Sequence, residues 1–209
     1  ALTASGTLTA TDVDSSNAFV AQTGTAGSNG YGTFSIDAAG AWTYTANTAH
    51  NEFAAGTNYT DSITVATADG TTQVITVTIA GTNDAAVITG TSTASLTETN
   101  AVLTASGTLT ATDVDSSNAF VAQTGAAGSN GYGSFTIDTA GSWTYTANSA
   151  HNEFAAGTNY TDSITVATAD GTTQVITVTI AGTNDAAVIT GTSTASLTET
   201  NVADRKSVV

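Results

Sequence analysis

The chain has no cysteine, no proline and almost no basic residues, and these absences exclude several classes of function. Without cysteine there is no disulfide bond and no thiolate chemistry. Arg205 and Lys206 are its only basic residues, against 17 acidic ones, and the formal net charge is -15. This charge excludes nucleic acid binding through phosphate neutralisation and disfavours an anionic membrane. Because no apolar run approaches the roughly 20 residues of a membrane span, we expect no membrane insertion.

The composition nevertheless predicts a folded protein. Hydrophobic residues make up 40% of the 209 positions, which is too many for a typical disordered acidic tail. The carboxylates have almost no lysine or arginine to pair with, so we expect cations to assist folding. No Met opens the sequence, which predicts that it is a part of a longer protein, and no charged-then-apolar signal segment stands at its start.

An internal repeat dominates the sequence. Residues 2–100 align without gaps on residues 103–201, an offset of 101, and only six of the 99 pairs differ. Those pairs are Thr25/Ala126, Thr33/Ser134, Ser35/Thr136, Ala38/Thr139, Ala41/Ser142 and Thr48/Ser149. Two near-copies of one active site are seldom needed side by side. No nucleophile elbow, zinc-protease motif or phosphate-binding loop occurs either, and we therefore expect no enzyme.

The repeat divides the chain if each unit starts after a Gly-Thr-Asn-Asp turn. Residues 1–84 are then a first repeat lacking its N-terminal strand, and residues 85–185 are a complete repeat. Residues 186–203 supply the N-terminal strand of a third. Residues 204–209 break the pattern in composition and charge, and we interpret them as a non-native tail.

Period-two alternation of apolar and polar residues predicts strands throughout the complete repeat. We expect them at about 87–97, 103–111, 119–124, 133–138, 143–148, 160–169 and 174–181. Seven strands in about 100 residues, with one Trp to fill the centre, predict an all-β fold of tandem seven-stranded Ig-like β-sandwich repeats. The expected core and sheet-face residues are Phe120, Phe135, Trp143, Tyr145, Ile164, Val166, Ile176, Val178 and Ile180.

Alternating strand directions gather polar residues at the two ends of the sandwich. Asp113, Asp115, Asn118 and Asp170 are predicted at the end beside the linker residues Asn83 and Asp84. Glu98 and Glu153 are predicted at the opposite end beside Asn184 and Asp185, with Asp162 as a further candidate there. Carboxylates clustered without basic residues repel one another unless metal ions or solvent intervene.

Oxygen ligands in this number suit Ca²⁺, which takes 6 to 8 of them. The junction between the repeats would combine Glu52 of the first repeat with the linker and the second repeat's Asp113, Asp115, Asn118 and Asp170. The first repeat carries the same ligand positions at Asp12, Asp14 and Asp69. The alternative is that these are ordinary solubilising surface charges.

Two other residues have simpler interpretations. Strand alternation points Trp143 inward, which favours a core role over stacking on a sugar. His151 is interpreted as a surface loop histidine, and one His per repeat without Cys disfavours a zinc site.

The motifs resemble a known family. Ala111-Thr112-Asp113-Val114-Asp115 is similar to the calcium motif of cadherin repeats, and Gly182-Thr183-Asn184-Asp185 resembles their terminal linker. Within that superfamily, residues 107–115 and 141–145 resemble the VCBS repeat of giant RTX-type bacterial surface adhesins. The chain departs from the cadherin pattern where His151-Asn152-Glu153 replaces Asp-Arg-Glu and where the linker is short. The resemblance implies a cadherin-like sandwich.

The resemblance also implies a function. It indicates calcium-stiffened extender repeats in a large secreted adhesin on the bacterial cell surface, exported by type I secretion and involved in cell adhesion and biofilm formation. The alternative is a surface module that binds glycan or protein by avidity, for which Tyr31, Tyr132, Phe53 and Phe154 are the candidate exposed aromatics.

The expected partners are the neighbouring repeats of the same chain and further copies of the chain. The first repeat lacks an N-terminal strand, and residues 186–201 are a spare copy of that strand. We therefore expect head-to-tail self-association through this segment.

Overall fold

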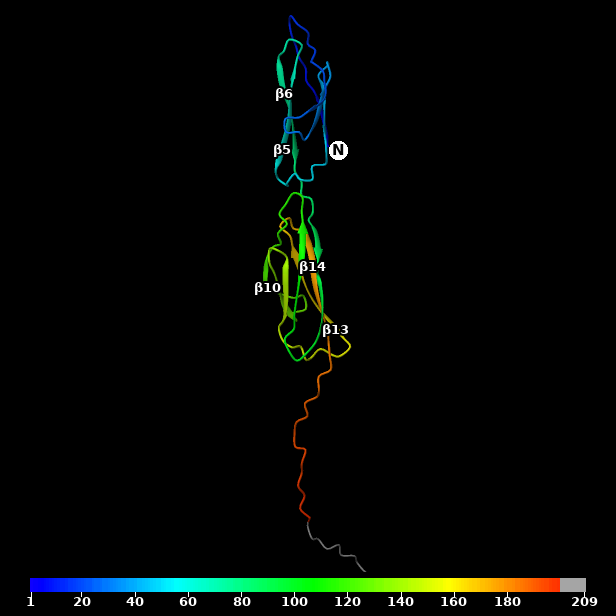
Figure 1. The fold of residues 1–209 in the computed structure, drawn as a ribbon, viewed down its shortest axis with the longest axis vertical. Helices are drawn as coiled ribbons and strands as arrows, with labels where there is room; N and C mark the ends of the chain where they lie inside the picture. The colour runs from blue at the N-terminus through cyan, green and yellow to red at the C-terminus, as the bar shows by residue number, and fades with distance from the viewer. Residues whose placement is uncertain (200–209) are drawn as a thin grey trace, which may run out of the picture.

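The computed structural model describes residues 1–199, which form two units built of β-strands (Figure 1). The first unit holds six strands: β1 (Thr3–Thr7), β2 (Gln22–Ala26), β3 (Gly32–Ile36), β4 (Ala41–Ala46), β5 (Asn58–Ala66) and β6 (Thr72–Ala80). The second holds eight: β7 (Val87–Gly90), β8 (Thr93–Thr97), β9 (Thr104–Thr112), β10 (Gln123–Ala127), β11 (Gly133–Ile137), β12 (Ser142–Ala147), β13 (Asn159–Ala167) and β14 (Thr173–Ala181). No helix long and apolar enough to cross a membrane is found among residues 1–199.

Each unit is a sandwich of two sheets. In the second unit the strand orders are β10-β11-β12-β9-β7 and β13-β14-β8. In the first unit the sheets are narrower, with orders β1-β4-β3-β2 and β5-β6. Neighbouring strands are antiparallel except for β8, which runs parallel to β14. The predicted all-β sandwich fold is confirmed.

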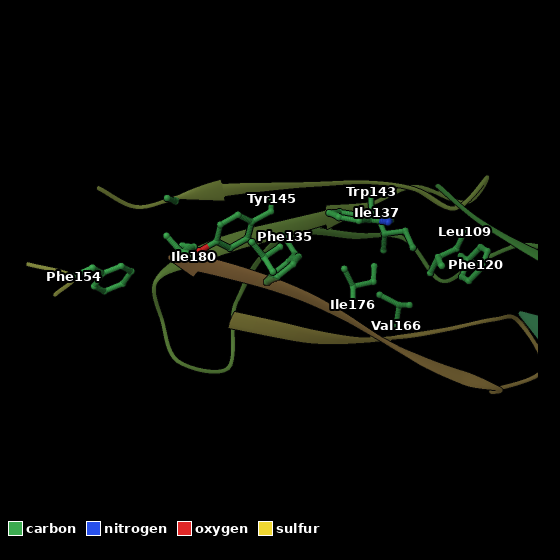
Figure 2. Close-up of a cluster of buried hydrophobic side chains, with 12 residues drawn as sticks. Leu109, Phe120, Phe135, Ile137, Trp143, Tyr145, Phe154, Val166, Ile176 and Ile180 are labelled. Atoms are coloured by element: carbon green, nitrogen blue, oxygen red, sulfur yellow. The ribbon is translucent and has the colours of Figure 1, made fainter. Parts of the chain in front are cut away.

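Alternating side chains from both sheets fill the core of the second unit (Figure 2). Trp143 and Tyr145 on β12 are completely buried, and Phe135 on β11 packs against Tyr145 with ring centroids 4.8 Å apart. Ile176 on β14 meets them from the opposite sheet. The predicted core residues are buried there, except Ile164, which packs against the core from a partly buried position. The period-two pattern thus predicted the buried faces correctly.

The first predicted strand, 87–97, is divided in the structure. Its first part, β7, pairs with β9, and its second part, β8, pairs with β14 in the other sheet. The division falls at Gly90, whose φ of 106° is strained for any residue with a side chain. A Cβ at Gly90 would also lie 2.4 Å from the carbonyl oxygen of Thr108. The chain therefore crosses between the sheets at this glycine.

The predicted strand 119–124 also differs from the structure, because β10 begins only at Gln123. Before it, the Phe120 N–H donates to the Thr139 carbonyl at 3.0 Å, and the Val121 N–H donates to the Ala167 carbonyl at 2.8 Å. Consecutive residues thus bond to segments on opposite sides of the sandwich. The chain passes between the sheets here, and Phe120 is buried as it does so.

Residues 186–199 follow the second unit as an extended segment whose residues are all exposed. In Figure 1 this segment leaves the second unit at the end opposite the first unit. The interpretation of residues 204–209 as a non-native tail lies outside the described residues, as do positions 200–203 of the predicted third repeat.

Candidate metal centre

A short acidic loop, residues 113–118, follows β9 and is closed by its own side chains. The Asp113 carboxylate accepts the N–H groups of Asp115 at 3.0 Å and Ser116 at 2.9 Å. The Asp113 N–H in turn donates to the Asn118 side-chain oxygen at 2.7 Å. Asp and Asn stabilise such turns because their short side chains reach the backbone two or three residues on. The loop therefore holds two carboxylates close together.

The first unit repeats this loop with the same bonds. The Asp12 N–H donates to Asn17 at 2.6 Å, and the Asp12 carboxylate accepts the N–H groups of Asp14 and Ser15 at 3.0 Å. Since the two copies lie in different surroundings, the loop conformation is set by its local sequence.

The linker between the units packs against the loop of the second unit. The Asp84 N–H donates to the Asp115 carboxylate at 3.3 Å. The Asn83 side-chain amide donates to Asp170 at 3.4 Å, and the Ala86 N–H donates to the same Asp170 oxygen at 3.1 Å. The structure thus brings together six of the predicted site residues, which we call the junction site: Asn83, Asp84, Asp113, Asp115, Asn118 and Asp170.

Asp170 is the best-satisfied carboxylate of the junction site. It accepts hydrogen bonds from the Thr168 hydroxyl, from the Thr172 hydroxyl at 2.7 Å and from the Thr172 N–H at 3.1 Å. These donors, with the Ala86 N–H, hold the pKa of Asp170 well below its usual value. Asp170 is therefore ionised at neutral pH and fixes the linker to the second unit.

Asp113 and Asp115 are less well satisfied. Oδ2 of Asp113 and Oδ1 of Asp115 are buried and have no hydrogen-bond donor. Burial raises the pKa of Asp115, and the neighbouring Asp113 carboxylate raises it further. Buried carboxylate oxygens are normally paired with a donor or a cation, because desolvating an unpaired charge is costly. Carboxylate oxygens are the ligands that a hard cation prefers, although no three His, Cys, Asp or Glu side chains within residues 1–199 are grouped to hold one.

Glu52, also predicted for this junction, makes its hydrogen bond within the first unit. Its carboxylate accepts a hydrogen bond from Nδ1 of His50 at 2.8 Å, and no hydrogen bond joins it to the linker in the described residues. Glu153 repeats this contact with His151 at 2.7 Å. Both glutamates therefore belong to a histidine pair within their own unit.

At the opposite end of the second unit, Glu98 is buried against the outgoing linker. One carboxylate oxygen accepts from the N–H of Thr183 at 3.2 Å and from its hydroxyl, whereas Oε1 is buried without a donor. Asn184 and Asp185 follow directly and are exposed. The predicted ligands Asp12, Asp14 and Asp69 lie in the first unit, and no hydrogen bond joins them to Asn184 or Asp185.

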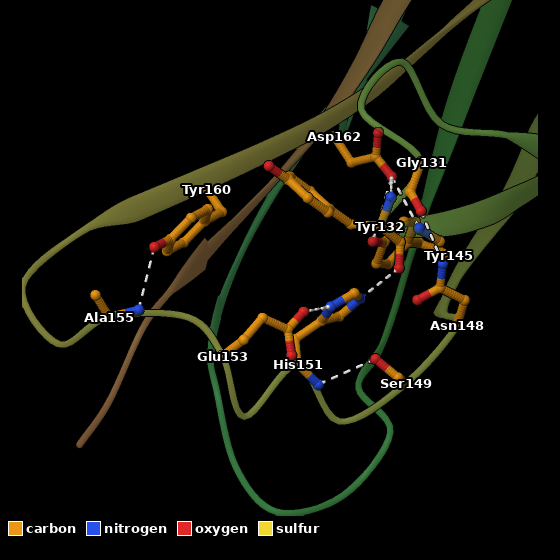
Figure 3. A network of polar contacts seen from close by, with 11 residues as sticks. Gly131, Tyr132, Tyr145, Asn148, Ser149, His151, Glu153, Ala155, Tyr160 and Asp162 are labelled. Atoms are coloured by element: carbon orange, nitrogen blue, oxygen red, sulfur yellow. Dashed lines mark hydrogen bonds and ion pairs between the residues drawn. The ribbon is translucent and has the colours of Figure 1, made fainter. Parts of the chain in front are cut away.

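Asp162, a candidate for the end cluster, is instead an interior anchor (Figure 3). Its fully buried carboxylate accepts N–H groups of Asn130 at 2.8 Å, Tyr132 at 3.1 Å and Gly133 at 3.0 Å. The loop approaches so closely that a Cβ at Gly128 would lie 2.0 Å from Oδ2 of Asp162. The Asp61 carboxylate holds the corresponding loop in the first unit.

His151 is buried rather than on the surface, which corrects the sequence interpretation. It adopts a φ of 58°, and its ring stacks on Phe154 with centroids 4.5 Å apart. Nε2 lies 2.7 Å from the Tyr132 carbonyl oxygen, so the ring bridges that loop and Glu153. The sequence signal for this pair was the spacing of three residues: His151 stands two positions before Glu153 and three before Phe154.

The two histidine pairs predict a pH-dependent contribution to stability. For His50, the Glu52 hydrogen bond raises the pKa; for His151, burial opposes the rise but Glu153 and the Tyr132 carbonyl outweigh it. The glutamate pKa values are lowered by the same bonds. The histidine contribution is complete below about pH 6.5 and is lost as pH rises through the folded-state pKa. The glutamate contribution is complete above about pH 4.5 and is lost as pH falls through its folded-state pKa.

We expect Glu153→Gln to lower the titration midpoint of His151 and leave that of His50 unchanged, measured by NMR of the imidazole protons. The stability difference from the wild type should be largest between about pH 4.5 and 6.5. His50 is the matched control within the same molecule. An unchanged His151 midpoint would show that Glu153 does not pair with it in solution.

The aromatic side chains offer no binding platform in the described residues. Phe53 and Phe154 are buried, and Tyr132 is half-buried with its ring edge-on to Phe154 at 4.9 Å. The exposed large hydrophobic residues of residues 1–199 are Val, Leu and Ile. No feature of this surface favours glycan recognition by stacking.

Comparison with known proteins gives one family. The family model described as "Bacterial cadherin-like domain" matches residues 1–81 and 83–182. A search of curated proteins finds no match. Among solved structures, the human desmocollin-1 ectodomain is similar at 16% identity and a TM-score of 0.37. That similarity covers 73% of this chain, which spans 32% of the desmocollin chain.

Proposed function

Because the chain belongs to the bacterial cadherin-like domain family, we propose that its units are calcium-stiffened extender repeats of a large secreted bacterial adhesin. The family is one of adhesion-type extracellular modules, which agrees with a chain without cysteine or catalytic motif. We propose further that the protein lies on the bacterial cell surface, is exported by type I secretion, and acts in cell adhesion and biofilm formation.

The observation that carries the calcium proposal is the pair of buried carboxylate oxygens without donors on Asp113 and Asp115. The linker carboxylate of Asp84 raises the negative charge beside them, and no basic residue precedes Arg205. Calcium accepts carboxylate, amide and carbonyl oxygens in a flexible shell that also admits water. The ligands would be Asp113, Asp115 and Asp84, with Asn83 and Asn118 as further oxygen donors.

Bound calcium would supply positive charge between groups that otherwise repel one another. The residues of the chain contribute the rest of the mechanism. Asp113 fixes the loop, Asp170 fixes the linker through Asn83 and Ala86, and Asp115 joins the loop to Asp84. An ion that binds the folded junction and not the unfolded chain stabilises the fold by mass action. The linker would then lose freedom, and the two units would hold a fixed relative orientation.

The test is calcium titration of the whole chain, followed by calorimetry and small-angle scattering. We expect the melting temperature in excess Ca²⁺ to exceed that in EDTA by about 10 °C, and the maximum dimension to increase. The double variant Asp113→Asn with Asp115→Asn should lose most of both responses. Asp138→Asn is the control, because the exposed Asp138 carboxylate accepts only the N–H groups of Ala140 and Ser142 in its own turn and no hydrogen bond from the junction site. An identical melting temperature in Ca²⁺ and EDTA would overturn the proposal.

A further inference from the structure

Asn29 and Asn130 are the only asparagines of the chain that are followed by glycine. An Asn-Gly pair is chemically unstable, because the glycine has no side chain to hinder attack by its backbone nitrogen on the asparagine side chain. Both pairs lie in the loop that a buried carboxylate holds, that of Asp61 in the first unit and that of Asp162 in the second. Each unit therefore carries one reactive pair at its interior anchor.

The reaction of such a pair converts asparagine to aspartate and releases ammonia. The backbone nitrogen of Gly131 gives up its proton and bonds to the side-chain carbonyl carbon of Asn130. The bond from that carbon to the amide nitrogen breaks, and the amide nitrogen leaves with the proton as ammonia. Water then opens the cyclic imide at either carbonyl. The products are aspartate and isoaspartate, and in isoaspartate the main chain runs through the former side chain.

The fold holds both reacting groups of the Asn130 pair in other contacts. The side-chain amide of Asn130 donates to the Thr161 carbonyl on β13 at 2.7 Å, and its backbone N–H donates to the Asp162 carboxylate at 2.8 Å. The N–H of Gly131 donates to the Gly128 carbonyl at 3.0 Å and closes a tight turn. Attack requires the amide and the Gly131 nitrogen to leave these partners and meet each other. The loop must therefore open before the reaction can occur.

The first unit repeats the same contacts. The Asn29 amide donates to the Thr60 carbonyl at 2.6 Å, and the Gly30 N–H donates to the Gly27 carbonyl at 3.0 Å. Asn29 and Asn130 are both exposed, so water reaches them in the folded chain. Protection therefore comes from the hydrogen bonds that hold the reacting groups, and not from exclusion of water.

Neither product fits the closed loop. An aspartate at position 130 has no donor for the Thr161 carbonyl, and it adds a negative charge beside that of Asp162. Isoaspartate lengthens the main chain between Gly128 and Gly133, where space is lacking. A Cβ at Gly128 would lie 2.0 Å from Oδ2 of Asp162, and a Cβ at Gly133 would lie 2.5 Å from a backbone oxygen of β12. A modified loop therefore cannot return to its place over the buried carboxylate.

We propose that Asn29 and Asn130 are sites of spontaneous deamidation that folding switches off, and that deamidation in the unfolded chain prevents the loop from closing. A unit that folds promptly keeps its amide. A unit that stays unfolded is modified and loses the loop contacts of Asp61 or Asp162. The time that a chain spends unfolded is thus recorded as a lasting covalent change. This inference is independent of the calcium proposal.

Incubation of the whole chain at mildly alkaline pH, with and without guanidinium chloride, tests the protection. Chymotrypsin cleavage and mass spectrometry distinguish the two loops, because their peptides differ at Thr25 and Ala126. We expect deamidation of both Asn-Gly pairs to be slower by about a hundredfold in the folded chain, since opening the loop breaks several hydrogen bonds at once. Equal rates in the two conditions would overturn the proposal.

Gly131→Ala is the control for the chemistry. It is measured in guanidinium chloride, where the φ of 72° that Gly131 adopts in the fold no longer matters. The added methyl group hinders attack on Asn130, so deamidation there should slow several-fold. Asn29 in the same molecule should keep its rate. An unchanged rate at Asn130 would refute the assigned attack by the Gly131 nitrogen.

The effect on the fold is tested with Asn130→Asp, which reproduces one product. We expect calorimetry to show a melting temperature of the second unit lower by about 5 °C, with the first unit unchanged. Asn159→Asp is the control with the same charge change, because Asn159 is exposed at the start of β13 and its side chain has no hydrogen bond within residues 1–199. Equal shifts from the two variants would show that the loop accommodates the product, contrary to the proposal.

Discussion

Replacing Asp162 with alanine is expected to destabilise the second unit by about 3 kcal/mol or more. The change leaves the buried N–H group of Gly133 and the partly buried N–H groups of Asn130 and Tyr132 without an acceptor. Each buried unsatisfied donor costs about 1 to 3 kcal/mol, and the space beside Gly128 gives water little access to replace the carboxylate. The loop between β10 and β11 should therefore lose its fixed position.

Guanidinium unfolding measures this loss, with Trp143 fluorescence reporting the second unit in a Trp42→Phe background. Asp138→Ala is the control: Asp138 also accepts two backbone N–H groups, from Ala140 and Ser142, but in an exposed turn. It should cost about 1 kcal/mol or less, because water can replace its carboxylate. Equal losses for Asp162→Ala and Asp138→Ala would contradict the anchoring role.

Replacing Trp143 with alanine is expected to cost about 3 to 5 kcal/mol, and the same change at Trp42 distinctly less. Trp143 is completely buried beneath β7 and β8 and donates a hydrogen bond to Thr91. Its removal leaves a cavity enclosed by both sheets. Trp42 is only half-buried, so less contact is lost and the surroundings can relax.

Calorimetry of the two variants checks this difference. The two units are each other's control, since their local sequences around the tryptophan are nearly the same. Equal shifts in the transitions of the two units would show that β7 and β8 add nothing to the burial of Trp143.

Period-two alternation was sufficient to predict the sandwich and its core. It reports which side of a strand is buried, and Phe135, Trp143, Tyr145 and Ile176 are all buried as it predicted. It does not report which sheet a strand joins. The segment 87–97 was predicted as one strand, yet it changes sheets at Gly90 because the chain there adopts a backbone conformation that suits glycine.

The candidate site was predictable where strand direction alone decides position. The loop 113–118 follows the end of β9, and the linker residues 83 and 84 enter the second unit at that same end of the sandwich, so the two segments meet. Asp162 was not predictable as an anchor, because its partners lie about 30 residues earlier and are backbone N–H groups common to any sequence. The burial of His151 likewise depends on a left-handed backbone conformation that its sequence does not signal.

The parallel pairing of β8 with β14 determines how a pulling force would act on the second unit. The chain enters the unit at one end, ahead of β7 and β8, and leaves it at the other end, after β14. Tension on the two linkers therefore slides β8 against β14 along their length. The five residue pairs from Thr93 and Thr177 to Thr97 and Ala181 are loaded together in shear, rather than opened one after another. This geometry lets a single sandwich resist extension along the chain axis.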